Sequence, residues 1–204
     1  MKKTLLNFIC CPVCSGEFKA VIIDSDKEEI INGKLNCNNC DMTYPIIRGL
    51  PIILDKVGKM ENTKNAFSTQ WRILSKGGFE KNTIYSQDET EELNEFKKTF
   101  ELNKWDQLNG KLILDAGCGS GRLSSNVAQK AKDSIVIGID ISDGAVVANE
   151  RAMQSTNHHV VQCDINNLPF RKDLFHVIWS QGVIHHTQNT YKSFKKLLEI
   201  IDPK

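Results

Sequence analysis

Short apolar runs alternate with amphipathic stretches through the second half of the chain. The apolar runs lie at residues 112–114, 135–139, 159–163 and 174–180. The stretches between and after them carry apolar residues at helical spacing, at 122–132, 142–153 and 190–201. Continuous apolar runs of this length, separated by helices, are typical of buried parallel strands joined by crossover connections. The pattern therefore predicts an α/β domain built around a parallel sheet.

A further helix is predicted at 89–103, ahead of the first of these strands. Asp88 or Ser86 can cap its start, because a side-chain oxygen there accepts hydrogen bonds from the free amides of the first turn. One face of this helix is apolar and carries Leu93, Phe96 and Phe100. Its charged residues are interpreted as a solvated face.

The first part of the chain has a different pattern. Apolar residues alternate with polar ones between about 18 and 35, which predicts short antiparallel strands. Residues 44–54 form an apolar ribbon with two prolines and a glycine, which favours an edge strand and a turn over a helix. Residues 59–86 are polar and mixed, and we interpret them as a linker with one short helix near 67–74.

Four of the seven cysteines fall in two C-x-x-C pairs, at Cys11 and Cys14 and at Cys37 and Cys40. Each pair places two thiolates on one tight turn, and two such turns can surround a tetrahedral Zn²⁺. A β unit this small buries little apolar surface, so bound metal would contribute free energy to its folding. Cys10 is out of register with Cys14, so Cys11 is taken as the ligand.

Composition adds limits to this picture. The chain has 204 residues and a formal net charge of +1, which gives no global electrostatic reason for binding nucleic acid or an anionic membrane. The apolar stretch at the N-terminus is too short for a targeting signal, and no run approaches the roughly 20 apolar residues of a membrane span. Cysteines spaced for metal rather than for disulfides favour a reducing compartment, and we expect a cytoplasmic protein without a membrane partner.

Three glycines at alternate positions follow the apolar run at 112–114. Gly117, Gly119 and Gly121 predict a tight turn whose backbone a ligand can approach closely, followed by the start of a helix with free amides. A dinucleotide site spaces its glycines G-x-G-x-x-G, whereas the spacing here is G-x-G-x-G. The next apolar run ends in Asp140, an acid at the place where nucleotide sites hold ribose hydroxyls.

The sequence D-A-G-C-G-S-G at 115–121 resembles motif I of class I S-adenosylmethionine (SAM) methyltransferases. The resemblance implies a Rossmann-like α/β core whose partial sheet has the strand order 3-2-1-4. It implies that Asp140 holds the ribose hydroxyls and that Asp164 bonds the adenine amino group. It also implies that a linker segment lies over the cofactor. The cofactor-binding residues so implied are Asp115, Gly117, Cys118, Gly119, Gly121, Asp140, Ile141, Asp164, Ile165 and Gln181.

The N-terminal ensemble of C-P-x-C, C-x-x-C and Y-P-I-x-x-G-L-P resembles the small zinc-ribbon activator subunit of tRNA and protein methyltransferases. That module is also found fused to methyltransferases, where its role is structural or partner-binding. Together the resemblances imply three parts: a zinc ribbon at 1–58, a linker or lid at 59–86, and a SAM-binding domain at 87–204. Since the family continues through further strands, we expect this chain to be C-terminally incomplete.

One departure from the family pattern and two candidate residues bear on the chemistry. The family usually has an aspartate where His176 stands, so one supporting contact of the site is in question. His185 and His186 are the nearest candidates for a general base, although packing of their loop is the more ordinary role. Cys118 is interpreted as a small residue facing the cofactor. No catalytic residue is assigned.

The predicted function is SAM-dependent transfer of a methyl group to a small molecule or biosynthetic intermediate, with structural Zn²⁺ in the ribbon. One alternative is an rRNA or tRNA methyltransferase that grips RNA with the ribbon, although an RNA binder should show clustered basic and aromatic residues. A second is a truncated module that binds SAM, or a protein partner through its ribbon, without turnover. A third, an NAD-dependent oxidoreductase, is disfavoured by the glycine spacing.

Overall fold

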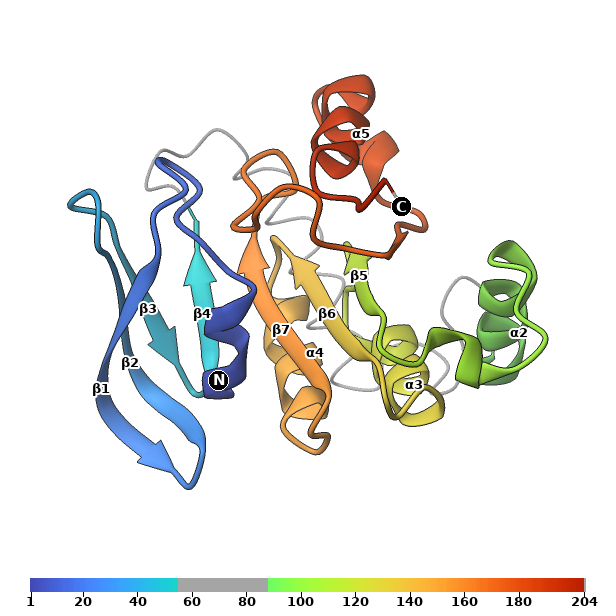
Figure 1. The fold of residues 1–204 in the computed structure, drawn as a ribbon, viewed down its shortest axis with the longest axis horizontal. Helices are drawn as coiled ribbons and strands as arrows, with labels where there is room; N and C mark the ends of the chain where they lie inside the picture. Colours follow the sequence, from blue (N-terminus) through green and yellow to red (C-terminus); the bar gives the residue numbers. More distant parts are fainter. Residues whose placement is uncertain (55–87, 204) are drawn as a thin grey trace.

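The computed structural model describes residues 1–54 and 88–203. The predicted linker, its short helix and the boundary at residue 58 therefore lie outside the described residues. The described strands form one eight-stranded sheet in the order β1-β2-β3-β4-β7-β6-β5-β8 (Figure 1). The strands are β1 Phe18–Asp26, β2 Glu29–Cys37, β3 Thr43–Ile47, β4 Leu50–Ile53, β5 Leu112–Ala116, β6 Ile135–Asp140, β7 His158–Cys163 and β8 Val177–Trp179.

The helices match the predicted positions and end a little earlier. The α-helices are α2 Glu89–Thr99, α3 Arg122–Lys130, α4 Gly144–Ala152 and α5 Thr190–Leu198, and the short 3-10 helices are η1 Lys3–Asn7, η2 Trp105–Leu108 and η3 Ile184–His186. Asp88 caps α2 as predicted, and it forms a capping box with Glu91. Asn189 caps α5 by accepting from the Lys192 amide at 2.9 Å.

The parallel half of the sheet confirms the predicted fold class. β7, β6, β5 and β8 pair in parallel, which is the order 3-2-1-4 when counted along the methyltransferase-like part of the chain. All five residues of β5 are buried, as expected for a central parallel strand covered on both faces. β8 is shorter than predicted, because the amides of Leu174 and Phe175 donate to the Ile200 carbonyl instead of joining the ladder.

The antiparallel half joins this sheet through β4. Leu50 and Pro51 pair with β3, and then Ile52 and Ile53 pair in parallel with Gln162 and Cys163 of β7. The expectation of an edge strand at 44–54 was therefore wrong. The prolines indicated an edge because they lack a donor, but β4 changes partner after Pro51, where ordinary residues provide the amides.

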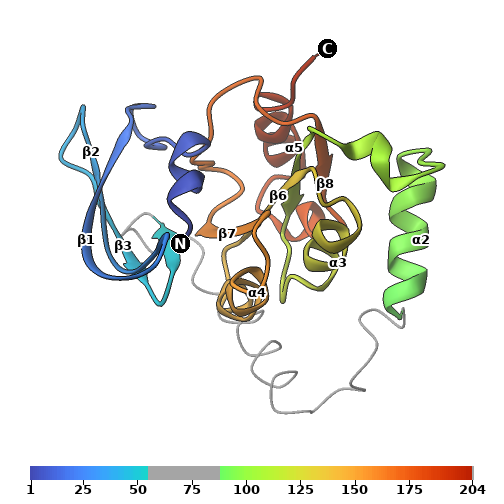
Figure 2. The ribbon, with the colours of Figure 1, turned by 60° about the horizontal axis from the view of Figure 1, so that its bottom comes forward.

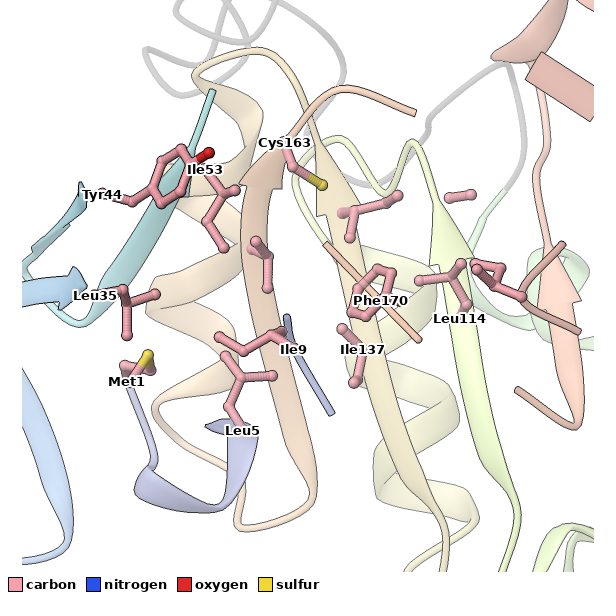
Figure 3. Packing of buried hydrophobic residues seen from close by; sticks show 14 of the residues in the cluster. Met1, Leu5, Ile9, Leu35, Tyr44, Ile53, Leu114, Ile137, Cys163 and Phe170 are labelled. Atoms are coloured by element: carbon pink, nitrogen blue, oxygen red, sulfur yellow. The ribbon is translucent and has the colours of Figure 1, made fainter. Parts of the chain in front are cut away.

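The two faces of the sheet are covered by different parts of the chain. Figure 2 shows α3 and α4 on one side of the parallel strands, with η1 and α5 on the other. The core on the second face is continuous from the N-terminal strands to the parallel ones (Figure 3). It contains, among others, Met1, Leu5, Ile9, Leu35, Tyr44, Ile53, Leu114, Ile137, Cys163 and Phe170. The N-terminal strands therefore share a hydrophobic core with the methyltransferase-like part.

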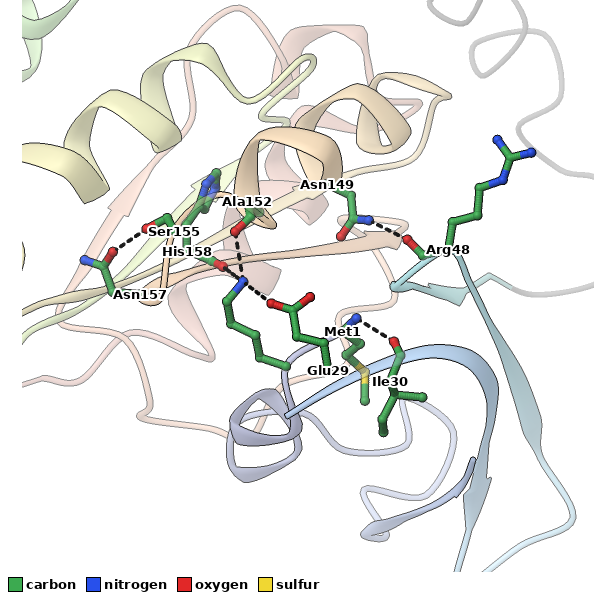
Figure 4. Close-up of polar contacts among 10 residues, drawn as sticks. Met1, Glu29, Ile30, Arg48, Asn149, Ala152, Ser155, Asn157 and His158 are labelled. Carbon is green, nitrogen blue, oxygen red and sulfur yellow. Dashed lines mark hydrogen bonds and ion pairs between the residues drawn. The ribbon is translucent and has the colours of Figure 1, made fainter. Parts of the chain in front are cut away.

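Polar contacts close the seam between the two halves (Figure 4). Lys2 Nζ donates to the carbonyls of Ala152 at 2.8 Å and His158 at 3.2 Å, and lies 3.3 Å from Glu29 Oε1. Further bonds join Asn149 Nδ2 to the Arg48 carbonyl at 3.0 Å and the Cys10 amide to the Pro169 carbonyl at 2.9 Å. These bonds satisfy backbone groups that the seam would otherwise bury without partners.

Candidate functional site

The glycine turn connects β5 to α3 and is closed by backbone bonds to β6. The amides of Gly117 and Cys118 donate to the Ile139 carbonyl at 2.8 and 2.9 Å. Gly117 has φ 88° and Gly121 has φ 72°, a region that residues with a Cβ rarely adopt. A Cβ on Gly117 would lie 2.3 Å from Val183 Cγ2, and one on Gly121 would lie 2.7 Å from Ala148 Cβ. Both glycines are therefore required by backbone conformation and by close packing.

The Asp140 carboxylate is fixed across this turn. Its Oδ2 accepts from the Gly119 amide at 2.8 Å, and its Oδ1 accepts from the Ser142 amide at 2.8 Å and from the Ser142 hydroxyl. Asp140 itself is half-buried at the carboxyl end of β6. The structure thus brings together the turn and the predicted ribose-binding acid, with the carboxylate oriented by backbone donors.

The other implied cofactor residues stand at the same edge of the sheet. Parallel strands bring their carboxyl ends together, and the residues in question follow β5, β6, β7 and β8 in turn. Asp164 is half-buried after β7, and its Oδ1 accepts from Asn166 N at 2.8 Å and from Asn166 Nδ2 at 3.2 Å. The side chain of Ile165 belongs to the core, whereas Ile141 is half-buried.

Two of the implied residues, Asp115 and Cys118, have raised pKa values. Asp115 is 7% exposed, and burial raises its pKa to about 7, with further contributions from the negative charges of Glu92 and Asp140. The Cys118 thiol lies against β6, where a Cβ on Gly138 would meet its Sγ at 2.9 Å. Burial raises the pKa of Cys118 well above its usual value, so its thiol stays protonated and is a poor nucleophile.

Helix α2 contacts the site through side chains that the sequence reading treated as solvated. Gln181 Nε2, after β8, donates to Glu95 Oε2 at 3.1 Å. Glu92 forms a buried ion pair of 3.0 Å with Arg122, the first residue of α3. Glu92 lies four residues before the buried Phe96, and this spacing was the signal that one flank of α2 faces inward.

The three histidines discussed from the sequence have different surroundings. His176 Nδ1 accepts from the Leu112 amide at 3.0 Å, so an imidazole provides the acceptor that a carboxylate could also provide there. His185 and His186 are exposed on η3, with ring centroids 4.0 Å apart.

The four predicted metal ligands form one cluster. Cys14 Sγ lies 3.4 Å from Cys37 Sγ and 3.4 Å from Cys40 Sγ, Cys11 Sγ lies 3.7 Å from Cys40 Sγ, and all four sulfurs are within 4.8 Å of one another. A disulfide requires about 2.05 Å, whereas a tetrahedron of Zn–S bonds of about 2.3 Å separates its sulfurs by about 3.8 Å. The Asn39 amide also donates to Cys37 Sγ at 3.4 Å. The donor set and its spacing therefore fit Zn²⁺.

Comparison with known families agrees with both halves of this architecture. A family described as "Methyltransferase domain" matches residues 113–204, and one described as "Trm112p-like protein" matches residues 2–49. The chain is a class I SAM methyltransferase domain preceded by a Trm112p-like zinc-ribbon region. The Trm112p-like region is 36% identical over 63 residues to a UPF0434 protein of Hahella chejuensis, covering 31% of this chain and 92% of that protein, and belongs to the same family.

The methyltransferase domain has relatives among curated enzymes and solved structures. It is 33% identical over 98 residues to a ubiquinone biosynthesis O-methyltransferase of Coxiella burnetii, covering 47% of this chain and 41% of that protein. The fold is similar to that of magnesium protoporphyrin IX methyltransferase from Synechocystis PCC 6803, with a TM-score of 0.50 and 21% identity over 69% of this chain and 67% of that one. The chain spans only 36% to 43% of the length of the curated methyltransferases it matches.

The described helices bear on the expectation of no membrane partner. Among residues 1–54 and 88–203, no helix combines the length and the apolar character that crossing a bilayer requires. The cytoplasmic location stays a prediction.

Proposed function

We propose that this chain binds SAM at the carboxyl edge of β5–β8 and transfers its methyl group to a small-molecule acceptor. The observation that carries the proposal is the Asp140 carboxylate fixed by Gly119 and Ser142 at the end of β6, beside a turn with three glycines of positive φ. This arrangement supports a ligand with a ribose and a charged end close to the backbone. The relatives named as O-methyltransferases support the same class.

Roles for the site follow from this geometry. The ribose hydroxyls would donate to Asp140, and the adenine amino group to Asp164, whose Oδ2 makes no bond within the described residues. Asp115 and the amides of the glycine turn would border the methionine end, with Gln181 on the side of β8. Cys118 would contribute its backbone, because its thiol faces β6.

The chemical step needs little from the protein beyond positioning. The sulfonium of SAM is already an activated leaving group, so holding donor and acceptor in line and excluding water accounts for most of the catalysis. An alcohol or phenol acceptor must also lose a proton. His185 and His186 lie near this edge but are exposed, so we assign neither of them as the base.

Zn²⁺ is proposed as a structural cofactor of the Trm112p-like region, held by Cys11, Cys14, Cys37 and Cys40. Four thiolates would complete its coordination and leave no open position for substrate or water, as in other structural zinc sites. This type of module also binds protein partners. In this chain the module already packs on the methyltransferase domain in cis.

Calorimetry with SAM, S-adenosylhomocysteine and NAD tests the proposal. We expect the first two to bind, and Asp140→Ala to weaken their binding by about 1–3 kcal/mol through loss of hydrogen bonds to a charged group. Asp133→Ala is the matched control, because Asp133 is an exposed acid just before the opposite end of β6. Binding of NAD in place of SAM, or equal affinities in the two variants, would contradict the assignment.

A further inference from the structure

Ser193 lies in the second turn of α5 and is fully buried, with 0% of its surface exposed. Its hydroxyl has three acceptors within reach, one in the loop after β7 and two in the loop before α5. It lies 2.9 Å from Asn166 Oδ1, 2.9 Å from Thr187 Oγ1 and 3.2 Å from the Asn189 carbonyl. A hydroxyl has one proton to donate, so it can serve only one of these acceptors well at a time.

The first acceptor leads to the cofactor side of the proposed site. Asn166 donates through both its amide and its side chain to Asp164 Oδ1, at 2.8 and 3.2 Å. With its Nδ2 on Asp164, the side chain of Asn166 presents its oxygen to Ser193. The orientation of the Asp164 carboxylate is therefore transmitted to the Ser193 hydroxyl through one side chain.

The second acceptor leads to the loop after β8. Thr187 Oγ1 donates to the Ile184 carbonyl at 2.7 Å, which closes η3, the short helix that carries His185 and His186. The residue before η3 is Val183, whose side chain lies directly over Gly117. This loop is thus held between the glycine turn at one end and Ser193 at the other.

We propose that Ser193 is a positioning residue that couples the loop of Asp164 to the loop of residues 183–189. Cofactor binding at Asp164 would then order the loop of residues 183–189, on the side where the methyl acceptor would bind. This inference rests on the proposed function. An adenine amino group that donates to Asp164 would share its charge and weaken the bond that Asn166 Nδ2 donates to it. Asn166 Oδ1 then becomes a poorer acceptor, so the Ser193 proton turns toward Thr187 and holds the loop of residues 183–189 more firmly. Buried polar networks transmit such changes because an unpaired group inside the protein is costly.

Hydrogen exchange measured with and without S-adenosylhomocysteine tests this coupling in the full chain. In the wild type, we expect the ligand to slow exchange both at residues 117–121 and at 183–189. In Ser193→Ala, the slowing at 117–121 should persist, whereas the slowing at 183–189 should fall by about fivefold or more, the usual size of a coupling between sites. A purely structural role for Ser193 would change exchange without ligand and leave the ligand response intact.

Variants of Thr187 provide a second route if Ser193→Ala does not fold. Thr187→Val removes the partner hydroxyl and should lose the response at 183–189, whereas Thr187→Ser keeps the hydroxyl and should retain it. A full response in Ser193→Ala or Thr187→Val, or none in a wild type that binds the ligand, would overturn the coupling alone. A wild type that binds no S-adenosylhomocysteine would overturn the proposed function as well.

Discussion

The cysteine cluster and the glycine turn are formed by residues that lie at very different separations along the chain. The cluster joins thiols that are 23 to 29 positions apart, whereas the turn forms within residues 115–121. The strands beside them differ in burial, because β1 is exposed along most of its length and β5 is buried throughout. The ribbon therefore depends on metal and on docking, while the parallel half depends on its own burial.

Removal of Zn²⁺ should give the largest loss of stability, and it acts first on the ribbon. Structural zinc contributes about 10–16 kcal/mol in small zinc peptides, so a chelator or Cys11→Ser should unfold the ribbon. Since the core is shared across the seam, we also expect faster amide exchange in β7 and a lower Tm for the whole chain. Cys10→Ala, next to the cluster but outside it, is the control. Unchanged exchange in β7 would show that the two parts are independent.

A cavity at the seam should have the next largest effect. Ile53 is 1% exposed in the shared core, so Ile53→Ala should lower the free energy of unfolding by about 2–5 kcal/mol. Ile47→Ala, on the neighbouring strand β3 and 49% exposed, should change it by less than about 0.5 kcal/mol. Urea unfolding followed by intrinsic fluorescence and by circular dichroism measures both. We expect one transition in each variant, and two separate transitions would contradict a shared core.

Two glycines with the same φ separate the cost of backbone conformation from the cost of close packing. Gly121 and Gly110 both have φ 72°, but a Cβ on Gly121 would meet Ala148 Cβ at 2.7 Å, whereas one on Gly110 meets nothing within 4 Å. Gly110→Ala should cost about 1–2 kcal/mol from backbone conformation alone. Gly121→Ala should cost about 1–3 kcal/mol more because α3 must move from α4. Equal stabilities of the two variants in thermal unfolding would contradict the packing role.

An effect that appears only in acid lies in β7, between the two halves. Burial, with smaller contributions from the positive charges of His159, Lys2 and Arg151, lowers the pKa of His158 to about 3. Below the unfolded pKa of about 6.5, the unfolded chain binds a proton that the folded chain rejects, so stability falls by about 1.4 kcal/mol per pH unit as pH decreases.

The variant His158→Leu should reduce the slope of the free energy of unfolding against pH by about 1.4 kcal/mol per pH unit between pH 6 and pH 4, which corresponds to one proton. The free energy of unfolding measured at each pH gives this slope. The sign follows from the lowered pKa: the contribution of His158 is greatest above pH 6.5 and is lost in acid. His185→Leu, an exposed substitution on η3, controls for the loss of a histidine. An unchanged slope in His158→Leu would show that this imidazole takes up a proton in the folded state.

Much of the parallel half could be predicted because its signals are local. The apolar runs gave the four strands, the alternate glycines gave the turn, and the acid after the second run is the one that bonds Gly119. The pairing of β4 with β7 could not be predicted, because nothing near the prolines of residues 44–54 indicates a partner far along the chain. The cofactor residues themselves stay predictions, apart from the contacts described among them.

Two side chains show why the remainder of the site was missed. Glu95 and Ser193 belong to helices whose polar residues are mostly exposed, so their sequence context favours a solvated face. Their actual roles depend on which flank of the helix meets the sheet, and that is decided by tertiary packing. Cys118 is half-buried beside Gly138, and its position facing the cofactor stays a prediction.

The pairing of β4 with β7 also has a consequence for synthesis on the ribosome. Gln162 lies 110 positions after its partner Ile52, and translation proceeds at about 5–20 residues per second. The ribbon is therefore complete for roughly 5–20 s before β7 can pair with it. During that interval β4 has an unpaired edge and its apolar residues have no partner, a state that favours aggregation. Early loading of metal, or a chaperone that shields this edge, would matter most for the yield of folded protein in those seconds.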